Sequence, residues 1–347
     1  MQSKLVQNLD SVKVFVNIAE RSPLNRQTKK NISIIIKIAI LVLAFGFIFQ
    51  ILTDNQNITD FRSLTKSITT LNVWIVIATL ILLMFLNWFL EALKWKYLLR
   101  NVEKISTWRA VESVFCGLTW AVFTPNRIGE YGGRVFFLSP RKRVIGLISM
   151  SVGAIGQMVI TNVLGSMALL WFVVSFMNLN VIVNFALTFL VAIFCSFFLV
   201  FYFNIQLIDS LLAKVKFIKP FRRFFSILAK YKKADLFRIL TYCLSRFAVF
   251  TSQYCVVILL LIPEIPIFSM IMVLFILFFI QSALPSLDIF DIGVRALTAT
   301  YFFGFLTDQE VAIMTATACI WLVNLIIPAI LGSAFVLKIN FFGNTRN

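Results

Sequence analysis

Histidine is absent from the 347 residues of the chain, and charged side chains are scarce. Without histidine the chain lacks the commonest metal ligand and general base, which excludes His-containing zinc or iron sites and serine–histidine triads. Charged residues make up 14% of the chain, against about 25% in an average soluble domain. The five cysteines all lie in apolar stretches without CxxC spacing. We therefore interpret them as small buried hydrophobic residues.

Apolar residues are abundant instead, at 60% of the chain, and Phe alone occurs 38 times. A soluble fold of this length cannot bury so much apolar side chain, because part of its surface must be polar. The composition therefore excludes a soluble globular protein, a disordered chain and a disulfide scaffold. It predicts an all-α polytopic membrane bundle.

Six apolar stretches have about the 20 residues that a membrane-spanning helix needs. Two further stretches, 110–138 and 267–305, are interrupted by polar segments that contain proline. We interpret each of these two as a pair of helical pieces. The chain is then expected to have about seven to eight spans, with one or two re-entrant helical hairpins. The six predicted spans are 32–52, 72–92, 144–176, 181–203, 237–262 and 310–337.

The basic residues are concentrated on one side of this predicted bundle. The loops of one side and the two ends of the chain carry 25 Lys and Arg, and the loops of the opposite side carry 2. This asymmetry predicts a multi-pass protein of the inner cell membrane with both termini in the cytoplasm. It explains the net charge of +17 without nucleic acid as a partner. We expect a cytoplasmic segment 1–31, one transmembrane domain 32–337 and a tail 338–347.

The charge tally places the two interrupted stretches on opposite sides. Stretch 110–138 is expected to enter and leave at the basic side. Stretch 267–305 starts and ends at the acidic side, either as a hairpin or as one full span with a short return. Such a pair resembles an inverted repeat, which in transporters marks a substrate site near the midplane. Segment 205–233 alternates apolar and basic residues at helical spacing. It predicts an amphipathic interfacial helix that serves as an anchor or attracts anionic lipids.

The first break carries an unusual set of charges. Thr124 is expected to cap a helix that has Pro125 at its first position. Arg127, Glu130 and Arg134 then share one face of that helix. Glu130 can fully neutralise only one of the two arginines, so the remaining charge and the helix N-terminus predict an anion site. The alternative is a salt-bridged break that holds the hairpin together. Close approach of a neighbouring helix or a headgroup is expected at Gly129, Gly132 and Gly133.

The second break has a weaker pattern around Pro285. Asp288, Asp291 and Arg295 follow at helical spacing, and Asp291 either caps a helix that starts near Ile292 or pairs with Arg295. With the charges of the first break and Arg246, the two sites together carry one excess positive charge. That excess suits a ligand that contains phosphate. The alternative is that these charges lie in a water-filled vestibule.

Three further polar residues lie inside the apolar spans. Gln157 and Gln253 are single polar residues, which we interpret as helix–helix contacts. Glu91 lies near the basic end of its span, where we expect it to pair with a basic side chain.

Residues 87–95 and 124–134 resemble the lysylphosphatidylglycerol synthase transmembrane-region family, which is also described as flippase-like. The resemblance covers roughly residues 35–337. The second break matches loosely through Pro285, Gly293 and Val294-Arg295. The first break matches a Pro-x-Arg-x-Gly-Glu-x-x-Arg core at Pro125, Arg127, Gly129, Glu130 and Arg134.

Two departures from the family's pattern affect what the resemblance implies. Many members have a Gly-Gly pair and a glutamate near the second break, where this chain has Leu287-Asp288-Ile289-Phe290-Asp291. Bifunctional members also carry a cytosolic aminoacyl-transfer domain after the membrane part, and this chain stops about ten residues after its last predicted span. The resemblance therefore implies the membrane module alone and argues against lysyl transfer to lipid.

We therefore expect an integral membrane protein that binds, and moves between leaflets, a phospholipid or lipid-linked molecule that bears phosphate. No cofactor or metal is expected, enzymatic activity is the less favoured interpretation, and homo-oligomerisation is left open. Two alternatives stand beside it: a membrane-embedded transferase for a lipid-linked substrate, and a non-transporting partner of an envelope enzyme. The substrate-binding residues are expected to be Arg127, Glu130, Arg134, Arg246, Asp288, Asp291 and Arg295. The structural residues at the breaks are Thr124, Pro125, Gly129, Gly132, Gly133, Pro285 and Gly293.

Overall fold

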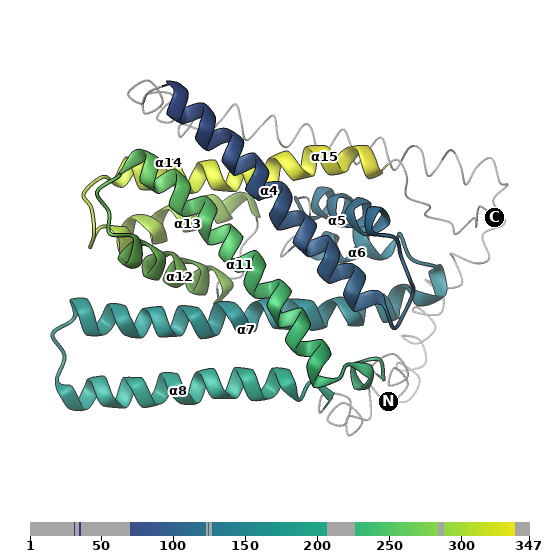
Figure 1. Ribbon diagram of the computed structural model, residues 1–347, viewed down its shortest axis with the longest axis horizontal. Coiled ribbons are helices and arrows are strands. Elements are labelled where there is room, and N and C mark those ends of the chain that lie inside the picture. The colour runs from purple at the N-terminus through teal and green to yellow at the C-terminus, as the bar shows by residue number, and fades with distance from the viewer. Residues whose placement is uncertain are drawn as a thin grey trace, which may run out of the picture.

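The computed structural model describes residues 70–122, 124, 127–206, 226–283 and 288–336, together with Asn31 and Ile35. All regular elements in these ranges are helices, which confirms the predicted all-α class (Figure 1). The longer helices are α4 (Thr70–Leu99), α5 (Thr107–Val122), α6 (Ile128–Val135), α7 (Arg143–Phe176), α8 (Val181–Phe203), α11 (Lys233–Leu261), α12 (Ile267–Ala283), α13 (Asp288–Phe303), α14 (Glu310–Trp321) and α15 (Ile327–Val336). Short helical turns are η2 (Pro140–Lys142), η4 (Leu228–Lys230) and η5 (Leu322–Ile326), the last of which is a π-helix that joins α14 to α15.

Five helical segments in the described ranges are long and apolar enough to cross a membrane. They match five of the six predicted spans. The sixth, 32–52, lies outside the described residues except for Ile35, and so does 207–225, the larger part of the predicted interfacial helix. The five segments are Leu71–Leu99, Pro140–Phe176, Val181–Phe203, Lys233–Leu261 and Glu310–Val336.

The centre of the bundle is formed by α4, α7 and α11 (Figure 1). Helices α4 and α11 pack along each other, and both contact α7. Met84 and Trp95 on α4, Val152 on α7, and Ile239 on α11 are fully buried in one continuous apolar core. Small residues let the backbones approach, as is common between membrane helices. A Cβ atom added to Gly165 of α7 would lie 2.3 Å from a side-chain atom of α12.

Helices α5 and α6 form a tightly packed pair. A Cβ atom on Gly133 of α6 would lie 2.7 Å from the Cα atom of Gly117 on α5, so neither position has room for a side chain. The pair is also fixed to α15. The Thr119 hydroxyl donates a hydrogen bond of 2.8 Å to the carbonyl oxygen of Ala329. A Cβ atom on Gly332 would lie only 2.0 Å from a backbone oxygen of α5.

Helices α12 and α13 form a second pair that lies at the opposite end of the molecule from α5 and α6 (Figure 1). They have 17 and 16 residues, or about 25 Å each at 1.5 Å per residue. One full span with a short return would give unequal helices, so these lengths favour the hairpin. The loops before α12 and after α13 lie at one end, and the α5–α6 pair lies toward the other. The break itself, 284–287 with Pro285, lies outside the described residues.

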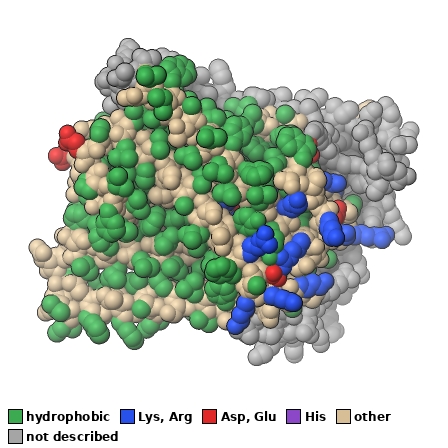
Figure 2. Space-filling view, viewed as in Figure 1, with side chains coloured by type: hydrophobic (Ala, Val, Ile, Leu, Met, Phe, Trp, Pro, Cys, Tyr) green, Lys and Arg blue, Asp and Glu red, His purple; other side chains and the backbone are tan. Residues whose placement is uncertain are grey.

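The surface is divided into an apolar region and a basic end (Figure 2). Lys and Arg side chains gather where α4 ends and α11 begins, and there Arg100 forms an ion pair with Asp235. Helix α8 exposes large apolar side chains, with Ile182 76% and Phe185 74% exposed. Such a contiguous apolar surface is expected to face lipid or another apolar partner. The sidedness of the charges agrees with the loop tally, while the assignment of the basic end to the cytoplasm stays a prediction.

Candidate functional site

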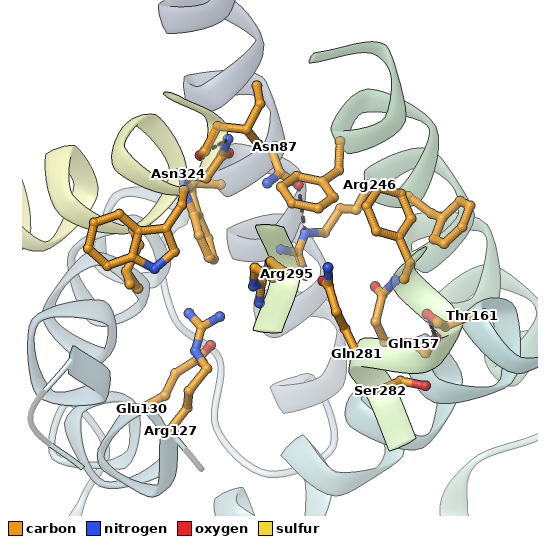
Figure 3. Close-up of a pocket in the computed structure, with 17 residues that line it drawn as sticks. Asn87, Arg127, Glu130, Gln157, Thr161, Arg246, Gln281, Ser282, Arg295 and Asn324 are labelled. Atoms are coloured by element: carbon orange, nitrogen blue, oxygen red, sulfur yellow. Dashed lines mark hydrogen bonds and ion pairs between the residues drawn. The ribbon is translucent and has the colours of Figure 1, made fainter. Parts of the chain in front are cut away.

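A cavity of about 420 Å³ lies where the two helix pairs meet the central helices (Figure 3). The α5–α6 pair contributes Arg127 and Glu130, and the α12–α13 pair contributes Gln281, Ser282 and Arg295. The remaining lining comes from α4, α7, α11, α14 and η5, with Phe278 from α12. It consists of Asn87, Trp88, Gln157, Thr161, Arg246, Phe247, Phe250, Phe278, Ile320, Trp321, Asn324 and Leu325.

Glu91 on α4 is the centre of the ion-pair network behind this cavity. Its carboxylate oxygens lie 2.7 Å from Nζ of Lys94 and 2.6 Å from a guanidinium nitrogen of Arg134, and they also accept a hydrogen bond from Arg246. The Glu91 side chain is only 7% exposed. Because a buried carboxylate must be paired, these three cations are what allow Glu91 to lie inside the bundle.

Glu130 pairs with both arginines of its own break. It accepts a hydrogen bond from Arg134, four residues on, and its other oxygen lies 3.4 Å from Nε of Arg127. Arg134 is therefore held between two carboxylates, those of Glu91 and Glu130, and its side chain is 1% exposed. It does not line the cavity. The spacing of the charges predicts that Glu130 reaches both arginines, but it does not predict the second carboxylate on Arg134.

Arg246 is the cation that joins the network to the cavity. Its Nε donates a hydrogen bond of 3.1 Å to Oδ1 of Asn87. Its guanidinium carbon lies 5.2 Å from the centre of the Trp88 ring, close enough for a cation–π interaction. With Glu91 as third partner, the Arg246 side chain is fixed on several sides, and it still lines the cavity. This placement agrees with its predicted inclusion in the site.

The backbone at the first break differs from the expectation in one respect. The sequence predicts a helix with Pro125 at its first position, but α6 begins at Ile128, and Pro125 lies outside the described residues. Arg127 precedes the helix with φ 55° and ψ 26°, the left-handed region that costs about 1–2 kcal/mol for a residue other than glycine. The capping prediction for Thr124 does hold, because its hydroxyl accepts a 2.6 Å hydrogen bond from the Gly129 N–H.

The glycines of the first break pack against α5. A Cβ atom on Gly129 would lie 2.3 Å from the backbone oxygen of Trp120, and Gly133 meets Gly117 as described above. Gly132 differs, since its nearest neighbour would lie 4.0 Å away. The predicted close approach is therefore made by a neighbouring helix at two of the three positions.

The second break contributes Arg295 to the cavity wall. The side chains of Asp288 and Asp291 lie outside the described residues, as do Pro285 and the surroundings of Gly293, so their predicted roles stay predictions. One detail is corrected. Helix α13 begins at Asp288, so Asp291 lies in its first turn and does not cap a helix that starts near Ile292. The neighbouring Gln281 and Ser282, which carry no distinctive signal in the sequence, line the cavity beside Arg295.

Two amides from opposite sides of the bundle also line the cavity. The sequence predicts a helix–helix contact for Gln157 on α7, but this residue faces the cavity, whereas Gln253 makes such a contact through a 3.4 Å hydrogen bond to the Leu80 carbonyl. Asn324 lies in the π-helical turn η5. Turns of this kind often occur at functional sites. A single asparagine in an otherwise apolar span is a signal that could have drawn attention to it.

The charges of the described network do not cancel. Glu91 and Glu130 face Lys94, Arg127, Arg134 and Arg246, which leaves two positive charges before Arg295 is counted. A surplus of this kind at a cavity wall attracts anions, and guanidinium groups bind the oxygens of phosphate or carboxylate through paired hydrogen bonds.

A bundle of apolar spans around a charged cavity defines a multi-pass integral membrane protein. The comparison with protein families agrees with this class. The model of the family described as the lysylphosphatidylglycerol synthase TM region matches residues 34–332, and the chain belongs to that family. No curated protein matches the chain.

Proposed function

We propose that this protein binds the phosphate-bearing headgroup of a lipid or lipid-linked molecule in the central cavity and moves that molecule between the leaflets. The observation that carries the proposal is the convergence of Arg127, Arg246 and Arg295 on one cavity from three separate segments. Basic side chains at this depth are costly unless they serve a purpose.

The state of Arg127 supports a role in ligand binding. Its Nε and Nη2 atoms are buried, and no described residue accepts a hydrogen bond from either of them. The ion pair with Glu130 is long at 3.4 Å, so it neutralises the charge in part and leaves N–H groups available. A phosphate oxygen at the cavity wall would satisfy these donors.

The size of the cavity supports a headgroup as the ligand. A volume of about 420 Å³ falls within the range of about 300–1,000 Å³ that is usual for small-molecule sites. We assign this space to the headgroup. The acyl chains would remain between the helices, in contact with the surrounding membrane.

The two helix pairs support a route for movement. They approach the cavity from opposite ends, and each contributes arginine to it. In transporters with broken helices, the two halves alternate in opening a central site to either side. Arg127 would take part directly, because it occupies the break itself. Arg134 and Glu91, which lie behind the wall, would act as positioning residues that fix Glu130 and Arg246.

Replacing Arg127 by asparagine tests this proposal. Asparagine tolerates the left-handed backbone, so the variant removes the charge and leaves the turn intact. Loss of a charge-assisted hydrogen bond is expected to weaken lipid binding about ten- to a hundredfold. The measurements are the amount of phospholipid that copurifies with the protein and the rate of translocation of a labelled phospholipid in reconstituted vesicles.

Arg141→Gln is the matched control for this test. Arg141 is an exposed basic residue on η2, away from the cavity lining. Its replacement removes the same charge from the chain, so it separates a local effect from a change in net charge. If Arg127→Asn binds and moves lipid as well as Arg141→Gln does, the cavity is not the lipid site.

A further inference from the structure

The cavity wall contains polar atoms that no described residue satisfies, in addition to its arginines. Two are acceptors, Oε1 of Gln157 and Oδ1 of Asn324. Three are donors: Nε2 of Gln281 and the indole nitrogens of Trp88 and Trp321. Buried polar atoms are almost always hydrogen-bonded in folded proteins. So many on one wall indicate a ligand, or water that a ligand displaces, with several polar groups.

The orientation of the Asn324 amide is fixed by its neighbours. Its amino group donates a 3.2 Å hydrogen bond to the Ile320 carbonyl oxygen, and its side chain is nine-tenths buried. Turning the amide would bring two oxygens together, which is unfavourable. Oδ1 is therefore the atom left for the cavity, and it needs a hydrogen-bond donor.

Acceptors on the wall restrict the chemistry of the ligand. An ionised phosphate has oxygens that accept hydrogen bonds, so it suits the arginines but not Oδ1 of Asn324 or Oε1 of Gln157. These two atoms require a group that donates. In a lipid headgroup that group is either a hydroxyl or an ammonium.

The charge of the site favours the hydroxyl over the ammonium. Five basic residues belong to the cavity or its network: Lys94, Arg127, Arg134, Arg246 and Arg295. Glu91 and Glu130 oppose them. Even if both aspartates of the second break were counted as well, one positive charge would remain. A cationic headgroup would add a like charge to a site where solvent screening is weak.

Aromatic rings complete the wall. Phe247, Phe250 and Phe278 line the cavity together with Trp88 and Trp321. Their faces can pack against C–H groups, and the two indoles also supply N–H donors. A sugar or polyol, which is polar at its edge and has C–H groups on its faces, matches this combination.

We propose that the ligand is an anionic lipid phosphate whose headgroup carries hydroxyl groups, from glycerol or from a sugar, and not an amine-bearing headgroup. This inference rests on the function proposed above and adds the class of substrate. The arginines bind the phosphate, while Asn324 and Gln157 accept hydrogen bonds from the hydroxyls. Phosphate therefore provides affinity, and the amides select among lipid phosphates.

The test compares short-chain phospholipids that differ only in their headgroup, with the full-length protein in detergent. Phosphatidylglycerol and phosphatidylpropanol have equal charge and similar size, but only the first has hydroxyls. Phosphatidylinositol represents a ring-shaped polyol, and lysylphosphatidylglycerol adds amines to the glycerol form. Free glycerol phosphate shows whether the lipid is needed. Binding is followed by native mass spectrometry and by tryptophan emission, to which Trp88 and Trp321 in the wall contribute.

The wild-type protein is expected to bind phosphatidylglycerol or phosphatidylinositol about tenfold more tightly than phosphatidylpropanol, the value of one or two hydrogen bonds. Lysylphosphatidylglycerol should bind more weakly than phosphatidylglycerol. Whichever of the two polyol lipids binds more tightly identifies the source as glycerol or a sugar-like ring.

Two variants on different helices assign the selectivity to the amides. Gln157→Met and Asn324→Leu each remove an acceptor with little change in volume. Each should lower the preference for phosphatidylglycerol over phosphatidylpropanol to about threefold or less, while phosphatidylpropanol binds as before. Arg127→Gln should instead weaken both lipids equally. Retention of the elution volume and melting temperature shows that each variant is folded, and the result from one suffices if the other does not fold.

The outcomes separate this inference from the function on which it rests. If the wild-type protein binds phosphatidylpropanol as tightly as phosphatidylglycerol, or prefers lysylphosphatidylglycerol, the hydroxyl assignment is wrong and the phosphate site stands. If no phospholipid binds, both proposals are wrong. Unchanged selectivity in both amide variants would also overturn the assignment.

Discussion

Replacing Glu91 by glutamine should destabilise the protein more than any other single loss of a carboxylate among the described residues. This side chain is 7% exposed and contacts three cations, Lys94, Arg134 and Arg246. Removal of one partner from a buried ion pair costs about 3–5 kcal/mol, because it leaves an uncompensated charge. Here the positive surplus of the network rises from two to three.

The assay is thermal unfolding in a single detergent, with aggregation and tryptophan emission as two readouts. Glu103→Gln is the matched control. Glu103 lies 3.9 Å from Lys142, and the lysine side chain is 45% exposed, so its loss is expected to cost about 1 kcal/mol or less. Glu91→Gln should therefore melt well below both the wild type and the control.

A second substitution tests the electrostatic cause. Lys94→Met removes one of the three cations and keeps most of the apolar stem, so it should partly rescue Glu91→Gln. The two residues should thus be coupled in a double-mutant cycle. If Glu91→Gln melts with the control, or if Lys94→Met adds its own loss without rescue, the network does not carry this stability.

Three further predictions concern packing and pH. Gly332→Ala should prevent normal packing of α15, since its Cβ would lie 2.0 Å from the Phe115 oxygen, whereas Gly132→Ala should be neutral or slightly stabilising in melting temperature; equal effects would contradict the close approach of α15 to α5. Thr119→Val should lower stability by about 1 kcal/mol through loss of the bond between α5 and α15, and an unchanged melting temperature would show that this bond contributes nothing. Burial raises the pKa of Tyr231 to about 12, so the wild type should lose stability relative to Tyr231→Phe as pH rises from about 10 to 12, where only the unfolded chain ionises first; parallel pH profiles would refute this.

The breaks in the apolar pattern are the most informative part of the sequence. Proline and charge within stretches 110–138 and 267–305 predict two interrupted helix pairs, and the structure has α5–α6 and α12–α13 there. The loop charges also place the pairs at opposite ends. These features are local in the sequence, because a helix break and its flanking charges lie within a few residues of one another.

The partners of each charge cannot be predicted in the same way. Arg134 meets Glu91 across 43 residues of sequence, and Arg246 meets Asn87 across 159. Helical spacing predicts only contacts within one helix, so it places Arg134 in the binding site, whereas this residue lies behind it. Lys94 gives no signal of its own, because a lysine near the basic end of a span is ordinarily a cytoplasmic flank. It is instead 4% exposed and paired with Glu91.

The role of single amides depends on the direction in which each helix face points. Gln157 and Gln253 look alike in the sequence, as isolated polar residues in apolar spans. The structure turns the first toward the cavity and the second toward a backbone carbonyl of α4. Rotation of a helix about its axis follows from packing with its neighbours, which a single sequence does not contain.

The positive surplus around Glu91 and Glu130 makes the stability of the bundle depend on what occupies the cavity. Any anion that binds there neutralises part of the fold, and a ligand that binds only the folded state raises its stability in proportion to the logarithm of its concentration. Protein stripped of lipid should therefore melt at a lower temperature than protein that retains it, and headgroup and bundle would depend on each other for stability.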